Sequence, residues 1–329
     1  MKKIIFLAHD PGGIDVIVPV YQSFPENIGL EKEFWAIGPA GKKYPEHQVD
    51  KVAVKEKLMN LLEMDKVLCM VSGTSWGDKT ELCCLETCRA YGIKTIIILD
   101  YWSNYIKRLQ LSEGEFFFPD AYLVMDDLAK REAVAEGIPE DIIHIVGRPG
   151  MEKYIHKIFD NGRDHPEMEN KVLFLSQPLS VLYGNSLGYN EFTVLEDLRC
   201  ICDELSLDLS IKFHPKDSDV FVSANRDIGI KGELSDVMMK CDWVIGMSSV
   251  ALLYAALMDI SVISYQPNLK GKDMSIINRL HLGHMVFSKC ELKRVLQRNA
   301  HEKKTSLIPE FAVNPIQRTL SQIILMINF

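Results

Sequence analysis

A phosphate-binding site is predicted where an apolar strand meets a helix in the second half of the chain. Residues 243–247 form an apolar run, and Ser248 and Ser249 then open a run that strongly favours a helix. The first N–H groups of a helix have no partners within it and the helix dipole is positive there, so this junction suits an anion. Residues that follow neighbouring strands would complete the site: Ser176, Gln177, Lys212, His214 and Pro215.

Ordinary structural roles could also explain these residues. A serine at the start of a helix is a common N-cap, and His214 beside Pro215 could form a solvated turn. The phosphate site is favoured by the combination of the two serines with His214, and a single serine would not predict it.

Candidate catalytic groups follow strands in the first half of the chain. His9 and Asp10 come directly after the apolar residues 4–8, and either side chain could remove a proton from an attacking hydroxyl. Asp10 is our preferred base, Asp100 after a later strand is a third candidate, and a helix-capping role for Asp10 is the alternative. Residues of the same turns could bind an acceptor, or could instead anchor the loops to the domain: Gly12, Gly13, Thr74, Ser75, Trp76, Tyr101, Asn104 and Arg108.

Familiar cofactor and metal motifs are missing from the sequence. It contains no dinucleotide fingerprint, no GxxxxGK[ST] loop and no HExxH helix, and Asp126-Asp127 is better explained as a helix cap than as a metal ligand. We therefore expect a reaction without metal or cofactor, in which helix N-termini and His or Lys stabilise a departing phosphate. The eight cysteines include no CxxC pair, which indicates reduced thiols in a cytoplasmic protein.

Bulk properties narrow the class further. The chain has 329 residues and a net charge of −8, so two domains are expected and nucleic acid is not an expected partner. No apolar run approaches the length of about twenty residues that a membrane span needs.

The elements that must position these residues alternate between strand and helix. Such alternation is typical of open parallel sheets covered by helices on both faces. A polar stretch at residues 160–170 predicts a linker, which gives domains at residues 1–165 and 166–329, and the helical run 314–329 could cross back to the first domain. The predicted strands are residues 3–8, 34–37, 66–71, 94–99, 121–125, 142–146, 171–175, 209–213, 243–247 and 261–265.

The layout resembles the GT-B superfamily of nucleotide-sugar enzymes over nearly the whole chain. This resemblance implies an α/β fold of two Rossmann-like, doubly wound parallel-sheet domains that face a central cleft. Lys212-Phe-His-Pro215 with Ser248-Ser249 is similar to the HP and SS motifs of bacterial sialyltransferases and polysialyltransferases, where the His and serines contact the phosphate of a CMP-activated sugar. Val146-Gly-Arg-Pro-Gly150 looks like the domain junction of UDP-N-acetylglucosamine 2-epimerases and CDP-glycerol glycerophosphotransferases.

The chain also departs from these families. The D/E-D/E-Gly motif of the sialyltransferases is not found, so the resemblance supplies no base. Ala251-Leu-Leu253 stands where the epimerases have a carboxylate pair, which counts against ribose recognition of that kind.

The resemblance implies a metal-independent glycosyltransferase. It would move a sugar from a CMP- or UDP-sugar on the second domain to a glycan acceptor of a bacterial surface polysaccharide, with closure near Gly147-Arg-Pro149 excluding water. Peripheral association with membrane glycan machinery is compatible with this role. The alternatives are a nucleotide-sugar 2-epimerase or hydrolase on the same fold, and a non-catalytic glycan- or nucleotide-binding protein.

Overall fold

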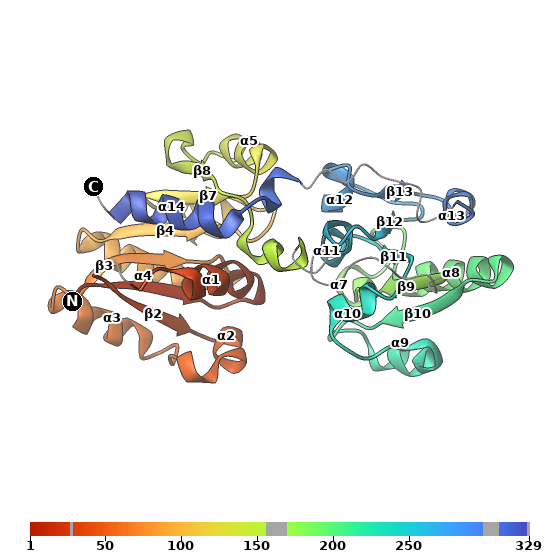
Figure 1. The fold of residues 1–329 in the computed structure, drawn as a ribbon, viewed down its shortest axis with the longest axis horizontal. Helices are drawn as coiled ribbons and strands as arrows, with labels where there is room; N and C mark the ends of the chain where they lie inside the picture. Colours follow the sequence, from red (N-terminus) through yellow and green to blue (C-terminus); the bar gives the residue numbers. More distant parts are fainter. Residues whose placement is uncertain (27–28, 156–169, 299–308, 328–329) are drawn as a thin grey trace. The chain divides into compact units, whose positions relative to one another are not determined.

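The structure is a computed structural model that describes residues 1–26, 29–155, 170–298 and 309–327. Its contacts divide the chain into two compact units (Figure 1). One comprises Met1–Glu152 with Ile308–Phe329, and the other comprises Lys153–Leu307. The domain boundary that we predicted at residue 165, and nearly all of the predicted linker at 160–170, fall outside the described residues.

The first unit is built on a six-stranded sheet in the order β2-β1-β3-β4-β7-β8, and all its strand pairs are parallel. The strand order reverses at β1, which lies between β2 and β3, so the loops after β1 and β3 meet at a switch point where such sheets bind ligands. The strands are β1 (Lys3–Ala8), β2 (Glu31–Ala36), β3 (Val67–Ser72), β4 (Lys94–Ile98), β7 (Ala121–Val124) and β8 (Ile143–Ile145).

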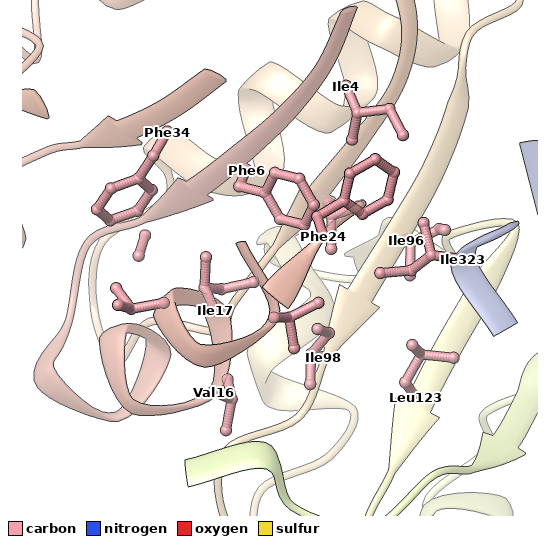
Figure 2. Packing of buried hydrophobic residues seen from close by; sticks show 14 of the residues in the cluster. Ile4, Phe6, Val16, Ile17, Phe24, Phe34, Ile96, Ile98, Leu123 and Ile323 are labelled. Carbon is pink, nitrogen blue, oxygen red and sulfur yellow. The ribbon is translucent and has the colours of Figure 1, made fainter. Parts of the chain in front are cut away.

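Alternating side chains of these strands pack against helices on the two faces of the sheet. Phe6 of β1 and Val71 of β3 belong to a cluster with Ile17 of α1 and Ile323 of α14, part of which is shown in Figure 2. On the other face, the Met70 sulfur lies 3.8 Å from that of Cys88 in α4. The helices are α1 (Pro11–Ser23), α2 (Pro39–Lys43), α3 (Val54–Glu63), α4 (Thr80–Ala90), α5 (Asp127–Ala135) and α14 (Pro315–Ile327).

The second unit repeats this plan with a five-stranded parallel sheet in the order β10-β9-β11-β12-β13. Its strands are β9 (Lys171–Leu175), β10 (Asp208–Lys212), β11 (Trp243–Gly246), β12 (Ser261–Tyr265) and β13 (His284–Val286). Its helices are α7 (Leu179–Tyr183), α8 (Glu191–Leu205), α9 (Asp219–Ala224), α10 (Leu234–Met238), α11 (Ala251–Leu257), α12 (Ile276–Arg279) and α13 (Lys289–Leu296). Here β9 lies between β10 and β11, so the loops after β9 and β11 meet at the second switch point.

The predicted α/β class with two Rossmann-like sheets is confirmed. Several details differ from the sequence prediction, and β13 is a strand of the second sheet that was not predicted. The helix expected to open at Ser249 begins at Ala251, and an antiparallel hairpin joins β5 (Gln110–Ser112) to β6 (Glu115–Phe116) where no strand was predicted. Short 3-10 turns complete the fold at Pro45–His47, Lys107–Leu109, Glu140–Ile142, Pro149–Met151, Arg226–Ile228 and Glu310–Ala312.

Candidate functional site

The turn after β1 holds Asp10 away from a capping role. Helix α1 begins at Pro11, whose fixed φ and missing N–H suit the first helical position, but the Asp10 side chain makes no cap hydrogen bond. One Asp10 oxygen instead accepts the Trp76 N–H at 2.8 Å, and the other lies 2.7 Å from Nδ1 of His9. Asp10 therefore links the loops after β1 and β3, and its side chain is 24% exposed.

The His9 imidazole lies between two carboxylates. Its Nδ1 contacts Asp10, and its Nε2 lies 3.4 Å from an oxygen of Asp78. Burial would raise the pKa of Asp78, but hydrogen bonds from Lys51 and Thr80 outweigh it and lower this pKa to about 2. The hydrogen bond between Nδ1 and Asp10, with the Asp78 carboxylate beside Nε2, fixes the ring next to Asp10.

A third carboxyl group, Glu81, lies behind this turn. Glu81 is 2% exposed in the first turn of α4, where one of its oxygens accepts the His9 N–H at 3.2 Å and the other bonds to the Ser75 hydroxyl. Sequence analysis missed both Glu81 and Asp78. A glutamate inside a helical pattern is ordinarily solvent-facing, and only the tertiary packing shows that this one is buried.

Asp100 belongs to an internal network with two residues that we predicted to bind an acceptor. One Asp100 oxygen accepts hydrogen bonds from Thr74 Oγ1 and from Arg108 Nη1, each at 2.6 Å, and Arg108 also lies 2.9 Å from Thr74 Oγ1. The other oxygen packs on Gly12, where a Cβ would lie 1.7 Å from it. The ion pair and this close packing hold Asp100 as a buried, partnered carboxylate.

Arg148, in the predicted junction sequence, makes its contacts within the first unit. It is 3% exposed, and it donates to the Asp100 carbonyl at 2.8 Å and to the Asp15 carboxylate of α1 at 2.7 Å. Arg148 therefore ties the end of β4 to α1, next to the turn that carries Asp10.

The aromatic residues after β3 and β4 differ in accessibility. Trp76 is 60% exposed beside Asp10, whereas Trp102 is buried and donates from its indole to Asp126 at 2.8 Å. Tyr101 is half-buried with its ring edge-on to Trp102, and Asn104 has a left-handed backbone with a φ of 57°. Among these aromatic residues, Trp76 is therefore the one that presents most of its surface to solvent. The other oxygen of Asp126 accepts the Ala129 N–H, as expected of a helix cap.

The second unit brings together Gln177, Ser248 and Ser249 of the predicted phosphate site. The Gln177 side-chain oxygen accepts the Ser248 N–H at 2.8 Å, and the Ser249 hydroxyl accepts the Ala251 N–H at 3.2 Å at the start of α11. The N–H groups of Ser249 and Val250 donate to no group in the part of the chain that the structure describes. Ser176, which precedes Gln177, is buried and extends the pairing of β9 with β10 by donating its N–H to the Lys212 carbonyl.

His214 and Lys212 both make hydrogen bonds within the second unit. The His214 Nδ1 accepts the Lys216 N–H at 3.0 Å, so its ring proton is on Nε2. Burial lowers the pKa of His214, although the Asp217 charge opposes this, and the ring is therefore neutral at neutral pH. The Lys212 ammonium donates to the Gly232 carbonyl at 2.5 Å, while Pro215 is exposed at the strand end.

Metal sites and membrane spans were sought among the described residues. No group of three or more His, Cys, Asp or Glu side chains there is arranged to hold a metal ion. None of the described helices is long and apolar enough to cross a membrane.

Solved structures share this fold along nearly the entire chain. The UDP-GlcNAc 2-epimerase of Methanocaldococcus jannaschii matches with a TM-score of 0.72 at 12% identity, covering 98% of this chain and 99% of that chain. The enzyme of Neisseria meningitidis, solved with UDP-GlcNAc bound, matches with a TM-score of 0.71 at 9% identity and the same coverage. A glycotransferase of kitacinnamycin matches with a TM-score of 0.63 at 10% identity, covering 99% and 98%.

These similarities show that the chain has the GT-B fold. At such low identity they show the fold alone. No protein-family model matches the sequence, and no curated protein matches it.

Proposed function

We propose that the protein is an enzyme that epimerises a nucleotide-activated sugar, with no second substrate. Epimerisation requires one group that removes a proton from the sugar and another that returns a proton to the opposite face. The two epimerases reported above share the fold, which supports this alternative over the glycosyltransferase that the sequence favoured. A UDP-sugar is the first substrate to test, because the Neisseria meningitidis enzyme was solved with UDP-GlcNAc bound.

The observation that carries this proposal is that residues predicted to bind an acceptor are hydrogen-bonded within the protein. Thr74 and Arg108 both bond to Asp100 within the first unit, so their polar groups are occupied by the protein itself. Asp10 is the more accessible carboxyl group, with a side chain 24% exposed against 12% for Asp100, and it contacts His9. In this proposal Asp10 removes the proton, and His9 fixes the position of the Asp10 carboxylate.

Three kinds of donor in the second unit suit a diphosphate. The N–H groups of Ser249 and Val250 precede α11, and the neutral His214 carries a proton on Nε2. The Ser248 and Ser249 hydroxyls can donate as well. Neutral donors of this kind bind phosphate oxygens by hydrogen bonding.

Incubation with UDP-GlcNAc in D2O, without acceptor, tests the proposal. We expect an equilibrium mixture of epimers in which the inverted carbon carries deuterium, detected by proton NMR, and CMP-sugars are tested in parallel. Asp10→Asn should reduce the rate by about 10²- to 10⁴-fold while UDP still raises the melting temperature. Release of nucleotide without epimer would indicate a hydrolase, and stabilisation by UDP without any turnover by the wild type would indicate a binding protein.

A glycosyltransferase is the second candidate, and the exposed Trp76 ring beside Asp10 favours it. An aromatic ring next to a base is a suitable platform for an acceptor sugar. Under this alternative, nucleotide release requires added glycan, and Trp76→Ala raises the KM for the glycan more than it lowers kcat. The likeness to the sialyltransferase motifs makes CMP-sugars the donors to test here, and a cytoplasmic location goes with either candidate.

A further inference from the structure

A buried acid lies behind the Asp10 turn, and the proposed roles of Asp10 and His9 do not use it. Glu81 bonds to the His9 N–H through one oxygen and to the Ser75 hydroxyl through the other. Glu81 is 2% exposed and Ser75 is 8% exposed, and the residue after Ser75 is the exposed Trp76. The pair therefore runs from the interior of the first unit toward the surface of the turn after β3.

We propose that Glu81 and Ser75 form a proton relay that delivers a proton to the bound sugar. This inference rests on the proposed function, because it assigns the donor of the proton that epimerisation must return. In each transfer Glu81 gives its carboxyl proton to Ser75 Oγ, while Ser75 gives its own hydroxyl proton to the ligand. Glu81 becomes a carboxylate, Ser75 is unchanged, and the ligand gains one proton.

Glu81 is loaded with a proton at neutral pH because its surroundings disfavour a negative charge. Burial raises the pKa of Glu81 to about 8, against the opposing hydrogen bond from Ser75, and the charges of Asp10 and Asp100 add to the increase. Asp10, by contrast, is accessible to solvent. Glu81 and Asp10 thus differ in their environment, and such a difference is what acid and base partners need.

The protonation state of Glu81 also decides whether the Ser75 hydroxyl can donate a hydrogen bond to a ligand. The Ser75 hydroxyl and a Glu81 oxygen are hydrogen-bonded to each other. In the proposed relay a neutral Glu81 is the donor of this bond, which leaves the Ser75 hydrogen for the ligand. A Glu81 carboxylate instead accepts that hydrogen and leaves Ser75 only its lone pairs. Ser75 is therefore a hydrogen-bond donor to the ligand when Glu81 is protonated, and an acceptor when Glu81 is deprotonated.

The elements packed around Glu81 add carboxylates rather than a compensating cation. Asp10 follows β1, Asp100 follows β4 and Asp78 precedes α4, and Lys51 is already paired with Asp78. Two cations lie elsewhere in the cluster, Arg108 paired with Asp100 and Arg148 with Asp15 of α1. Helix α1 presents Gly13 to the acid, where a Cβ would lie 3.8 Å from the Glu81 oxygen.

Infrared difference spectroscopy tests whether Glu81 is protonated, and it needs no substrate. The spectrum of the wild type minus Glu81→Gln at pH 7 should contain the carbonyl band of a protonated carboxylic acid, and this band should disappear above pH 9. Ser75→Ala should shift the band, because it removes the hydroxyl that accepts from Glu81. Glu86→Gln, an exposed glutamate on the same helix, is the matched control and should leave the spectrum unchanged.

Epimerisation of UDP-GlcNAc in D2O tests the use of the relay. Glu81→Gln keeps the shape and hydrogen bonds of the acid but has no proton to give, so we expect about 10²-fold slower deuterium incorporation and loss of the alkaline limb of the pH profile. Ser75→Ala should behave alike, and Ser75→Thr should restore most of the rate. Circular dichroism of each variant checks that it is folded.

The outcomes separate the relay from the proposed function. If the wild type shows no epimerisation, the proposed function fails, and the infrared band still decides whether Glu81 is loaded and bonded to Ser75. Absence of the band at pH 7, or a Glu81→Gln variant with wild-type rate and pH profile, overturns the relay.

Discussion

Single side chains decide which carboxyl groups of the first unit can exchange protons with a ligand. Asp100 is held by Arg108 and Thr74 and packs on Gly12, whereas Asp10 is 24% exposed and contacts His9. The most buried of these acids, Glu81, keeps its proton because burial penalises its anion. The chemistry of the turn therefore follows from differences in burial and pairing among residues of the same type.

The raised pKa of Glu81 predicts a pH dependence of stability that Glu81→Gln removes. The unfolded chain releases this proton near the ordinary pKa of 4.5, and the folded protein keeps it until about pH 8. Between these values the folded state binds more protons, so the free energy of unfolding falls by about 1.4 kcal/mol per pH unit from this group. Denaturant titrations from pH 5 to pH 8 should show the wild type losing stability relative to Glu81→Gln. Parallel curves for the two proteins would contradict the raised pKa.

Gly12 and Gly13 predict unequal effects of the same substitution. A Cβ on Gly12 would meet the Asp100 carboxylate at 1.7 Å, whereas a Cβ on Gly13 would make an ordinary contact with the Thr74 carbonyl at 3.6 Å. We expect Gly12→Ala to cost about 1–3 kcal/mol of unfolding free energy because Asp100 must move, and Gly13→Ala to cost less than about 1 kcal/mol. Urea denaturation measures both. Equal losses would show that Gly12 does not set the position of Asp100.

At the scale of elements, the candidate residues of each unit come from loops after neighbouring parallel strands. Asp10 after β1 bonds to Trp76 after β3, and Gln177 after β9 bonds to Ser248 after β11. Because the carboxyl ends of parallel strands lie at one edge of the sheet, strand order alone brings these loops together. The side-chain bonds then fix their distances.

Removal of the hydrogen bond between Gln177 and the Ser248 N–H should weaken nucleotide binding. Gln177→Ala leaves the Ser248 N–H without its acceptor, so the turn before α11 loses its anchor to β9. We expect about 2- to 10-fold weaker UDP binding, measured by titration calorimetry, since one neutral hydrogen bond contributes about 0.5–1.5 kcal/mol. Gln297→Ala, at an exposed position beyond α13, is the control. Unchanged affinity for UDP in Gln177→Ala would place the nucleotide away from this turn.

Buried strands were predictable from sequence because both faces of a parallel sheet are covered, which leaves continuous apolar runs such as residues 4–8 and 172–175. The β5–β6 hairpin was not, because Gln110–Ser112 is short and mostly polar. In the candidate site, polar residues at strand ends were found from their position in the pattern. Glu81 and Asp78 were missed because long-range packing, rather than local sequence, gives them their environment.

At the scale of the whole molecule, the first unit is built from both ends of the chain. Helix α14 packs beside α1 on the first sheet, where Leu320 and Ile323 join a core that includes Ile96 and Leu123 (Figure 2). The intervening residues Lys153–Leu307 form the other unit.

This arrangement predicts a large effect of truncating one side chain of α14. Ile323 is fully buried, so Ile323→Ala should lower the free energy of unfolding by about 2–5 kcal/mol through the cavity it leaves. Leu325, on the same helix, is 49% exposed, and Leu325→Ala should change stability by less than about 0.5 kcal/mol. Thermal or denaturant unfolding of the two variants makes the comparison, and similar losses would show that α14 does not dock through this face.

The position of α14 has a consequence for how the protein is made. A ribosome synthesises the strands of the first sheet early, but the helix that covers Ile96 and Leu123 emerges only after the second unit. The first unit must therefore wait with part of its apolar surface uncovered while the second unit can already fold. A nascent chain stalled before residue 315 should bind chaperones through the first sheet, and release of the full chain should end that binding.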